Sequence, residues 1–435
     1  MILILLILSL AGLMQAARSF TTGTAMDSVG TAQAFGYLLL TGFFAGLLFK
    51  RIRLPKLTGY LATGIIVGPP VLGLVSQPSL DTLKLVSGVA TALIALTAGT
   101  ELQLRALKPL LRSILWITLV AVCGTTVLLT ITVFFARPLL PFVAQLPILQ
   151  AAAVSLLLGV VMTAQSPAVV VALRTEMNAE GPLTSTVLGV VVIADLVVIV
   201  MFAIASTLAK AAFGTGAGVV TTLRVLTWEL LGSMAAGVLI GLMLWFYLKK
   251  VRASSGLFIL LTCCVIAEVG RRLDFDPLLL ALAAGTFIRN VTSVGDKLHD
   301  AIESSALPIY VVFFAVAGAT IHLKELPLIF APALLFIVVR AAGFLWGAQL
   351  GARIAQAPEV VRRYAGFGLL PQAGLALALA LLFSRTFPEL GSAASALLLG
   401  IVALNEILAP AIYRFALVRS GEAGQGRHAS SAGDH

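Results

Sequence analysis

The sequence predicts an all-α, polytopic membrane protein, and composition, hydropathy and charge distribution each support this class. Of its 435 residues, 60% are hydrophobic and only 11% are charged, far less charge than the surface of a soluble protein of this length carries. The mean hydropathy is +1.06, and apolar runs of roughly 20 residues, long enough to cross a bilayer, recur along the chain. The net charge of +10 comes mainly from short loops between these runs. That pattern orients a membrane protein and argues against a nucleic-acid partner.

Apolar windows predict thirteen transmembrane helices, arranged as two inverted six-helix repeats joined by a connecting span. The windows are 33–49, 57–75, 81–99, 112–136, 148–173, 184–208, 224–248, 255–270, 276–289, 305–322, 328–353, 362–383 and 391–416. The pair at 255–270 and 276–289 is short, and a re-entrant hairpin there would leave the parity of the crossings unchanged.

The two ends of the chain lie outside these windows. Residues 1–17 contain a short apolar run followed by QAARS, which resembles a cleavage site loosely. They form either a signal peptide or an extra helix, and both interpretations stay open. Residues 417–435 are polar and are expected to form a disordered cytoplasmic tail.

The loops predict the orientation of the chain. One set of alternate loops carries more than twice as many Lys and Arg residues as the other set. Because cytoplasmic loops hold the excess of positive charge, the C-terminus is expected in the cytoplasm. We expect a multi-pass protein of a bacterial-type inner (plasma) membrane.

Two predicted spans are interrupted in the middle by proline and polar or small residues. The fifth contains TAQSP (163–167) and the twelfth contains LLPQAG (369–374). A proline kink alone would be tolerated in a membrane helix. However, paired interrupted helices in corresponding halves indicate a transporter binding site. The breaks lie seven spans apart, an odd number, so the two copies have opposite orientations in the membrane.

Asp195 is the ionisable residue in the apolar run VLGVVVIADLVVIV (187–200). A charge at the centre of a bilayer costs at least about 2.5–3.5 kcal/mol. Loss of water favours the neutral carboxyl, so this group can exchange a proton for a metal cation. The alternative is a neutral Asp195 that hydrogen-bonds to a neighbouring helix.

Other polar residues near the breaks are candidates for the same site. Thr163, Gln165 and Ser166 offer neutral oxygens suited to a hard monovalent cation, although each can equally hydrogen-bond within a helix bundle. Arg340 lies deep in the eleventh span, far from both ends, so a central role is favoured over snorkelling. The three cysteines show no metal-ligand spacing. We expect no cofactor and no enzymatic activity.

Seven stretches, taken together and in order, make the chain resemble the monovalent cation/proton antiporters. That family shares its membrane domain with sodium/proton exchangers and glutathione-gated potassium efflux transporters. The stretches are LPKLTGYLATGIIVGPPVLGLV (54–75), ALTAGTELQLRAL (95–107), MTAQSPAVVVALRTE (162–176), IADLVVIV (193–200), FDPLLLALAAGTFI (275–288), LPIYVVFFAVAGATIHL (307–323) and GLLPQAGLALALALLF (368–383).

The resemblance implies an exchanger membrane domain over 33–416 and a homodimer. A panel (33–99 and 255–322) would form the dimer, a core (112–208 and 328–416) would carry the ion, and span 224–248 would link them. Asp195 would bind the proton or the cation, and Arg340 would occupy the family's core basic position. The crossed unwound stretches would be the segment from Thr163 to Pro167 and the region around Gln372. Ala194 departs from the family pattern, which places aspartate or asparagine before the aspartate.

The predicted function is secondary active antiport of Na⁺ or K⁺ against H⁺ by alternating access, with Asp195 binding each ion in turn. With Ala194 at the preceding position, Asp195 is expected to be the one core carboxylate, which predicts electroneutral one-for-one exchange. A sodium-coupled organic anion symporter and a non-transporting membrane sensor or scaffold are the alternatives. The expected partners are the monovalent cation, H⁺, the lipid bilayer and a second copy of the chain.

Overall fold

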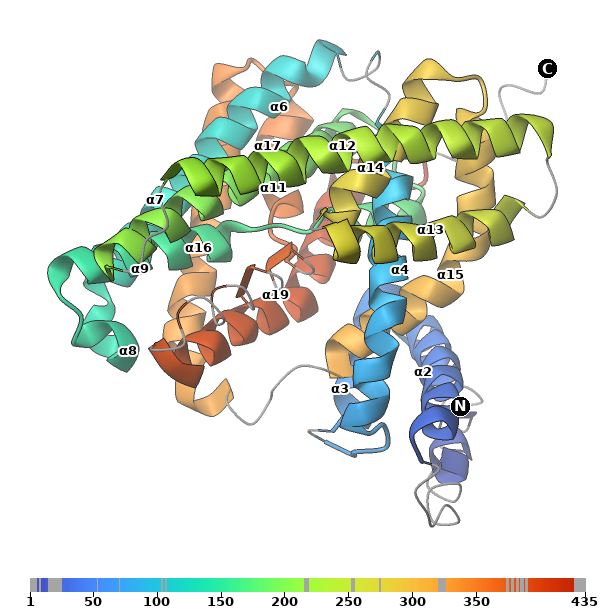
Figure 1. The fold of residues 1–435 in the computed structure, drawn as a ribbon, viewed down its shortest axis with the longest axis horizontal. Helices are drawn as coiled ribbons and strands as arrows, with labels where there is room; N and C mark the ends of the chain where they lie inside the picture. Colours follow the sequence, from blue (N-terminus) through green and yellow to red (C-terminus); the bar gives the residue numbers. More distant parts are fainter. Residues whose placement is uncertain are drawn as a thin grey trace. The chain divides into compact units, whose positions relative to one another are not determined.

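Every regular element in the described part of the chain is a helix (Figure 1). The computed structural model describes residues 6–7, 9–14, 26–52, 54–69, 71–102, 105, 108–214, 219–251, 255–273, 275–319, 326–372, 375–376, 379–380, 383, 387 and 390–425. The predicted all-α class is therefore confirmed.

The chain forms two compact units, each made of two separate stretches of sequence. The first unit comprises residues 1–101 and 233–323. Its helices are α2 (Met26–Arg51), α3 (Lys56–Val67), α4 (Gln77–Glu101), the second part of α12 (Val219–Lys250), α13 (Ser255–Leu273), α14 (Pro277–Val291) and α15 (Gly295–Ala319).

The second unit comprises residues 102–232 and 324–435. It contains η1 (Lys108–Leu110), α6 (Leu111–Ile117), η2 (Thr118–Cys123), α7 (Gly124–Phe135), η3 (Arg137–Leu139), α8 (Pro141–Ala144), α9 (Ile148–Thr163), α10 (Pro167–Met177), α11 (Pro182–Ala212), the first part of α12, α16 (Leu326–Ile354), α17 (Glu359–Gly368) and α19 (Gly391–Arg419). The predicted panel ranges lie in the first unit and the predicted core ranges in the second. Their roles as dimer panel and ion carrier stay predictions.

Each of the thirteen predicted windows contains helix, but thirteen membrane crossings are not confirmed. Among the described residues, eight helices are long and apolar enough to cross a membrane, or nine if the bent pair within α15 is one span. Helices α3, α13 and α14 are apolar but shorter. The window 57–75 is helical only to Val67, because Gly68 and Pro69 end the helix there.

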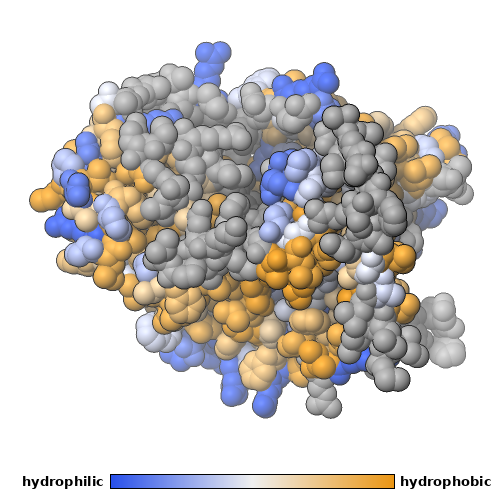
Figure 2. All heavy atoms as spheres, turned by 90° about the horizontal axis from the view of Figure 1, so that it is seen from below, coloured by the Kyte–Doolittle hydropathy of each residue, from blue (hydrophilic) through white to orange (hydrophobic). Residues whose placement is uncertain are grey.

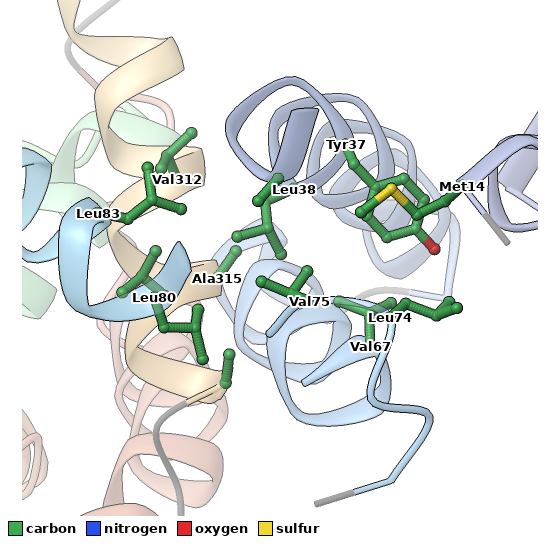
Figure 3. Close-up of a cluster of buried hydrophobic side chains, with 13 residues drawn as sticks. Met14, Tyr37, Leu38, Val67, Leu74, Val75, Leu80, Leu83, Val312 and Ala315 are labelled. Carbon is green, nitrogen blue, oxygen red and sulfur yellow. The ribbon is translucent and has the colours of Figure 1, made fainter. Parts of the chain in front are cut away.

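The first unit has a core in which helices far apart in sequence meet. Figure 3 shows Tyr37 and Leu38 of α2, Leu80 and Leu83 of α4, and Val312 of α15 converging with residues around the end of α3. Met14, within the N-terminal stretch 1–17, packs at Tyr37 in the same cluster. The described residues of that stretch are helical. Whether the stretch is a signal peptide or a retained helix stays an open prediction.

Helices α4 and α14 of the first unit approach each other through glycine. A Cβ added to Gly99 would lie 2.5 Å from the Leu282 carbonyl oxygen, and one added to Gly285 would lie 2.4 Å from the Leu96 carbonyl oxygen. Only a residue without a side chain fits at both points. Such close backbone contact is typical of membrane helices, because their packing has no hydrophobic driving force between helices.

In the second unit, α16 packs against the segment formed by α6, η2 and α7 through a row of glycines one turn apart. A Cβ on Gly343 would meet Thr125, one on Gly347 would lie 2.7 Å from Cα of Ala121, and one on Gly351 would meet Ile117. The facing element η2 is a π-helix, an irregularity often found at functional sites. This contact fixes the middle of α16, which carries Arg340.

Large hydrophobic side chains are exposed along several helices, as expected for contact with lipid. They include Phe135 of α7, Trp228 of α12, Trp346 of α16 and Phe415 of α19. Figure 2 shows hydrophobic residues over broad areas of one face, with hydrophilic residues gathered elsewhere. Patches of this extent are unusual on soluble monomers.

The close contact at Gly347 makes a stability prediction. We expect Gly347→Ala to destabilise the protein by about 1–3 kcal/mol, because the new methyl group would overlap backbone atoms that cannot move independently. Gly124→Ala is the matched control, since a Cβ there meets nothing within 4 Å. Thermal unfolding followed by size-exclusion chromatography in detergent measures both variants. Equal melting temperatures for the two would contradict this packing.

Candidate functional site

Helices α9 and α10 form one broken helix around the sequence TAQSP. Helix α9 ends at Thr163, residues 164–166 are not helical, and α10 begins at Pro167. Proline fits the first helical position because its missing N–H needs no partner there. Ser166 caps α10 by accepting a hydrogen bond from the Val169 amide at 3.3 Å. The break leaves the last carbonyl groups of α9 without their usual partners inside the helix.

A second interruption follows α17 in the same unit. Helix α17 ends at Gly368, and residues 369–372, which include Pro371, are not helical. The sequence predicted this break at 369–374, of which residues 373 and 374 lie outside the described residues. Its carbonyl groups at Leu369 and Leu370 also lack helical partners.

Arg340 joins the two breaks. Its Nε donates to the Met162 carbonyl at 2.7 Å, and Nη2 donates to the Ala164 carbonyl at 3.0 Å. On the other side, Nη1 donates to the Leu370 carbonyl at 2.7 Å, and Nη2 lies 3.5 Å from the Leu369 carbonyl. One guanidinium therefore satisfies carbonyl groups at the C-terminal ends of two half-helices, where the helix dipoles are negative.

The side chain of Arg340 is 1% exposed, so it does not snorkel to the membrane surface. Its guanidinium carbon lies 4.7 Å from the centre of the Phe344 ring, one turn further along α16. The direct hydrogen-bond partners of its charge are the carbonyl groups at the ends of the two broken helices.

A chain of side-chain amides extends this network to α19. Gln372 Nε2 donates to the Met162 carbonyl at 2.9 Å, and Asn405 Nδ2 of α19 donates to Gln372 Oε1 at 2.9 Å. Gln372 and Asn405 are both buried. The sequence singled out Gln372 but not Asn405, whose amide in an apolar helix was the available signal.

The three candidate ligands in the first break differ in how they are used. Thr163 Oγ1 donates to the Gly159 carbonyl at 2.8 Å and lies 3.1 Å from Thr126 Oγ1. Ser166 serves as the helix cap. Gln165 is 1% exposed, and neither of its amide atoms has a hydrogen-bond partner among the described residues. Since buried polar groups are normally satisfied, Gln165 is the best placed of the three to bind a ligand.

Asp195 lies near the middle of α11, in the same unit as the two breaks. Its side chain is 1% exposed, and Ala194 beside it is fully buried. Helix α11 packs against α9, α10 and α17, the three helices that border the interruptions. The structure thus brings the carboxylate, the broken helices and Arg340 into one compact body.

The sequence reasoning missed a second buried carboxylate. Glu406 follows Asn405 on α19 and is 3% exposed. Its signal was LNEILAP (404–410), an acidic residue in the middle of an apolar run. The expectation that Asp195 is the one carboxylate in the core is therefore wrong, and a single carboxylate no longer supports one-for-one exchange.

Glu422 is a further buried acid, at the N-terminal end of the helix that carries Asp195. Its carboxylate accepts from the amides of Leu183 at 2.7 Å and Thr184 at 2.8 Å, and from the Thr184 hydroxyl at 2.6 Å. Two backbone bonds, from Glu180 to Glu422 and from Gly424 to Met177, hold the same segment.

The tail was expected to be disordered from residue 417. Residues 417–425 are instead helical to Arg419 and then bound to α11, because Glu422 satisfies amides that every helix leaves free at its start. Residues 426–435 lie outside the described residues.

Comparisons with known proteins agree on one family. A family model described as "Sodium/hydrogen exchanger, transmembrane" matches residues 37–419. The Na(+)/H(+)-K(+) antiporter GerN of Bacillus cereus is 25% identical over 359 residues, which cover 79% of this chain and 85% of GerN.

Solved structures of the sodium proton antiporter MjNhaP1 from Methanocaldococcus jannaschii have a similar fold. The structure at pH 8 gives a TM-score of 0.66 and covers 91% of this chain and 99% of that chain. A second, from electron microscopy, gives 0.70 and covers 91% and 98%. Sequence identity is 16% in both cases, so the likeness concerns the fold.

The bonds of Arg340 predict a large effect on stability. We expect Arg340→Ala to lower the free energy of unfolding by about 3–5 kcal/mol, because buried carbonyls of two half-helices lose their donors. The free energy of unfolding of Arg340→Lys should lie between those of wild type and Arg340→Ala. A point-like ammonium cannot reach both breaks in the way that a planar guanidinium does. Thermal unfolding in detergent measures the series. An Arg340→Ala protein as stable as wild type would contradict a structural role.

The capping bonds of Glu422 predict that the tail is held by about 1–2 kcal/mol. Glu422→Ala should therefore speed cleavage by trypsin after Arg419, detected by mass spectrometry, by roughly five- to thirtyfold. Gln425→Ala is the control, because its exposed amide binds only within the tail, to the Gly421 carbonyl. Equal cleavage rates in the two variants would show that the cap does not hold the tail.

Proposed function

Because this chain belongs to the sodium/hydrogen exchanger family, we propose that it exchanges Na⁺ or K⁺ for H⁺ by alternating access, with Asp195 binding the proton and the cation in turn. The chain is a cation/proton antiporter of the sodium/hydrogen exchanger type and a multi-pass membrane transporter. GerN is named for both Na⁺ and K⁺, which supports keeping both cations as candidate substrates.

The burial of Asp195 carries the proposal. An ionised carboxylate near the middle of a membrane helix is unfavourable without a cation beside it. The group is therefore either protonated or bound to a cation, and a site with these two states exchanges one ion for the other. Alternating access then requires that each state opens to either side while the empty, charged state does not cross.

The neighbouring groups fit this chemistry. Gln165 offers an amide oxygen at the first break, and unwound backbone there offers carbonyl oxygens suited to a hard monovalent cation. Thr163 and Ser166 have defined structural bonds, so we assign them to shaping the break. Arg340, Gln372 and Pro167 would hold the two interruptions in place.

The wider assignments follow from the same proposal. The second unit would carry the ion, the first would form the dimer, and helix α12 would link them. The protein would lie in the bacterial inner membrane with its C-terminus in the cytoplasm. A sodium-coupled organic anion symporter is not favoured, because the matched family exchanges ions. A sensor without transport would not need a buried Asp195.

The proposal predicts that Asp195→Asn abolishes cation-dependent proton movement, because asparagine cannot release a proton. The assay is pH change in proteoliposomes of the purified protein after addition of Na⁺, K⁺ or Li⁺, tested separately.

Asp276→Asn is the matched control for this substitution. Asp276 caps α14 in the first unit by accepting from the Leu278 and Leu279 amides, and asparagine caps a helix equally well. This variant should exchange at the wild-type rate. Exchange that persists in Asp195→Asn would refute the role of Asp195.

A further inference from the structure

Glu406 has the features of an ion-binding carboxylate and not those of a carboxylate that serves only the fold. It lies near the middle of the 29-residue helix α19, as Asp195 does in α11 and Arg340 in α16. Its neighbour Asn405 belongs to the amide chain that reaches the Met162 carbonyl. No hydrogen bond or ion pair joins the Glu406 carboxyl to any described residue. A buried acid kept for structure is normally satisfied by hydrogen bonds.

Pro410 frees the backbone carbonyl oxygen of Glu406 from its usual helical hydrogen bond. In a helix, the carbonyl of residue 406 would accept from the amide of residue 410, but proline has no amide hydrogen. Glu406 therefore presents a buried carboxylate together with a backbone carbonyl deprived of its usual donor. Oxygens of these two kinds are the ligands that hard cations prefer.

Among the described helices that pack against α19, the one charge that is buried at the middle of a helix is Arg340. Helix α19 packs against α8, α9, α10, α16 and α17. Helices α8 and α9 carry no charged residues. On the other three, every charge except the buried Arg340 lies near a helix end and is at least partly exposed: Arg174, Glu176, Arg353, Glu359, Arg362 and Arg363.

We propose that Glu406 is a second ion-binding carboxylate of this antiporter, and that one monovalent cation displaces two protons, one from Asp195 and one from Glu406. The inference rests on the proposed exchange function. When both carboxyls are protonated, Arg340 leaves the second unit with one central positive charge. With one bound cation and both carboxylates ionised, those central charges sum to zero. The difference is one charge per cycle, so exchange is electrogenic.

A count of released protons tests this directly and does not need transport. Purified protein in weakly buffered detergent solution receives NaCl, KCl or choline chloride, and a pH dye reports the protons released per chain at saturation. Wild type should release two with the transported cation and none with choline. Glu406→Gln, which mimics a permanently protonated Glu406, should release one. Glu406→Asp keeps a titrating group and should release two.

Glu268→Gln is the matched control, because Glu268 is an exposed acid paired with Arg272 in the first unit. This variant should release two protons per chain, as wild type does. Release of two protons from Glu406→Gln, or of only one from wild type, would overturn the proposal.

Transport gives an independent measure of the same stoichiometry. Proteoliposomes are clamped at zero membrane potential with the permeant anion thiocyanate at equal concentrations inside and outside. At a pH difference of one unit across the membrane, the measurement finds the ratio of Na⁺ concentrations on the two sides at which net flux stops. The ratio should be about a hundredfold for wild type and about tenfold for Glu406→Gln, by the proton linkage of two groups or one. A thiocyanate gradient should shift the wild-type ratio by about fiftyfold per 100 mV and leave Glu406→Gln unshifted.

The outcomes separate this inference from the proposed function. Wild type without any cation-dependent proton flux would refute the antiport itself. Wild type that exchanges at a tenfold ratio would support antiport and refute the role of Glu406.

Discussion

The second unit depends on one buried guanidinium. Two helices of this unit break in the middle, and each break exposes carbonyl groups that a membrane interior cannot satisfy with water. Arg340 donates to Met162 and Ala164 at one break and to Leu370 at the other. The positive charge is in turn stabilised, because those carbonyls form the negative ends of the half-helices. The charge and the breaks are each costly alone, and together they offset one another.

This pairing determines what the rest of the site can do. Because Arg340 is held by carbonyls of the two breaks and a guanidinium keeps its proton in proteins, its positive charge stays fixed. The glycine row of α16, packed against η2, holds that charge in position, because Arg340 and the glycines lie on the same helix.

Much of this was readable from the sequence, because the signals were local. Proline beside polar or small residues at 163–167 and 369–374 marked both breaks, and a lone charge in an apolar run marked Asp195 and Arg340. Glu406 carries the same signal, an acidic residue within an apolar run, although it lies more than 200 positions beyond Asp195 and in a different helix. The cap by Glu422 was not readable, since it joins residues that lie 239 apart in the sequence. The partners of Arg340 are backbone carbonyls, which no side-chain pattern reveals.

In the proposed exchange, a proton and a monovalent cation compete for the same buried carboxylates. The most direct measurement is the dissociation constant of Na⁺ or K⁺, by isothermal titration calorimetry of the purified protein, as a function of pH. Competition predicts that affinity for the transported cation rises with pH, by about tenfold to a hundredfold per unit where one or both carboxyls are protonated. A dissociation constant that does not change with pH would show that the cation binds elsewhere, and it would contradict the account.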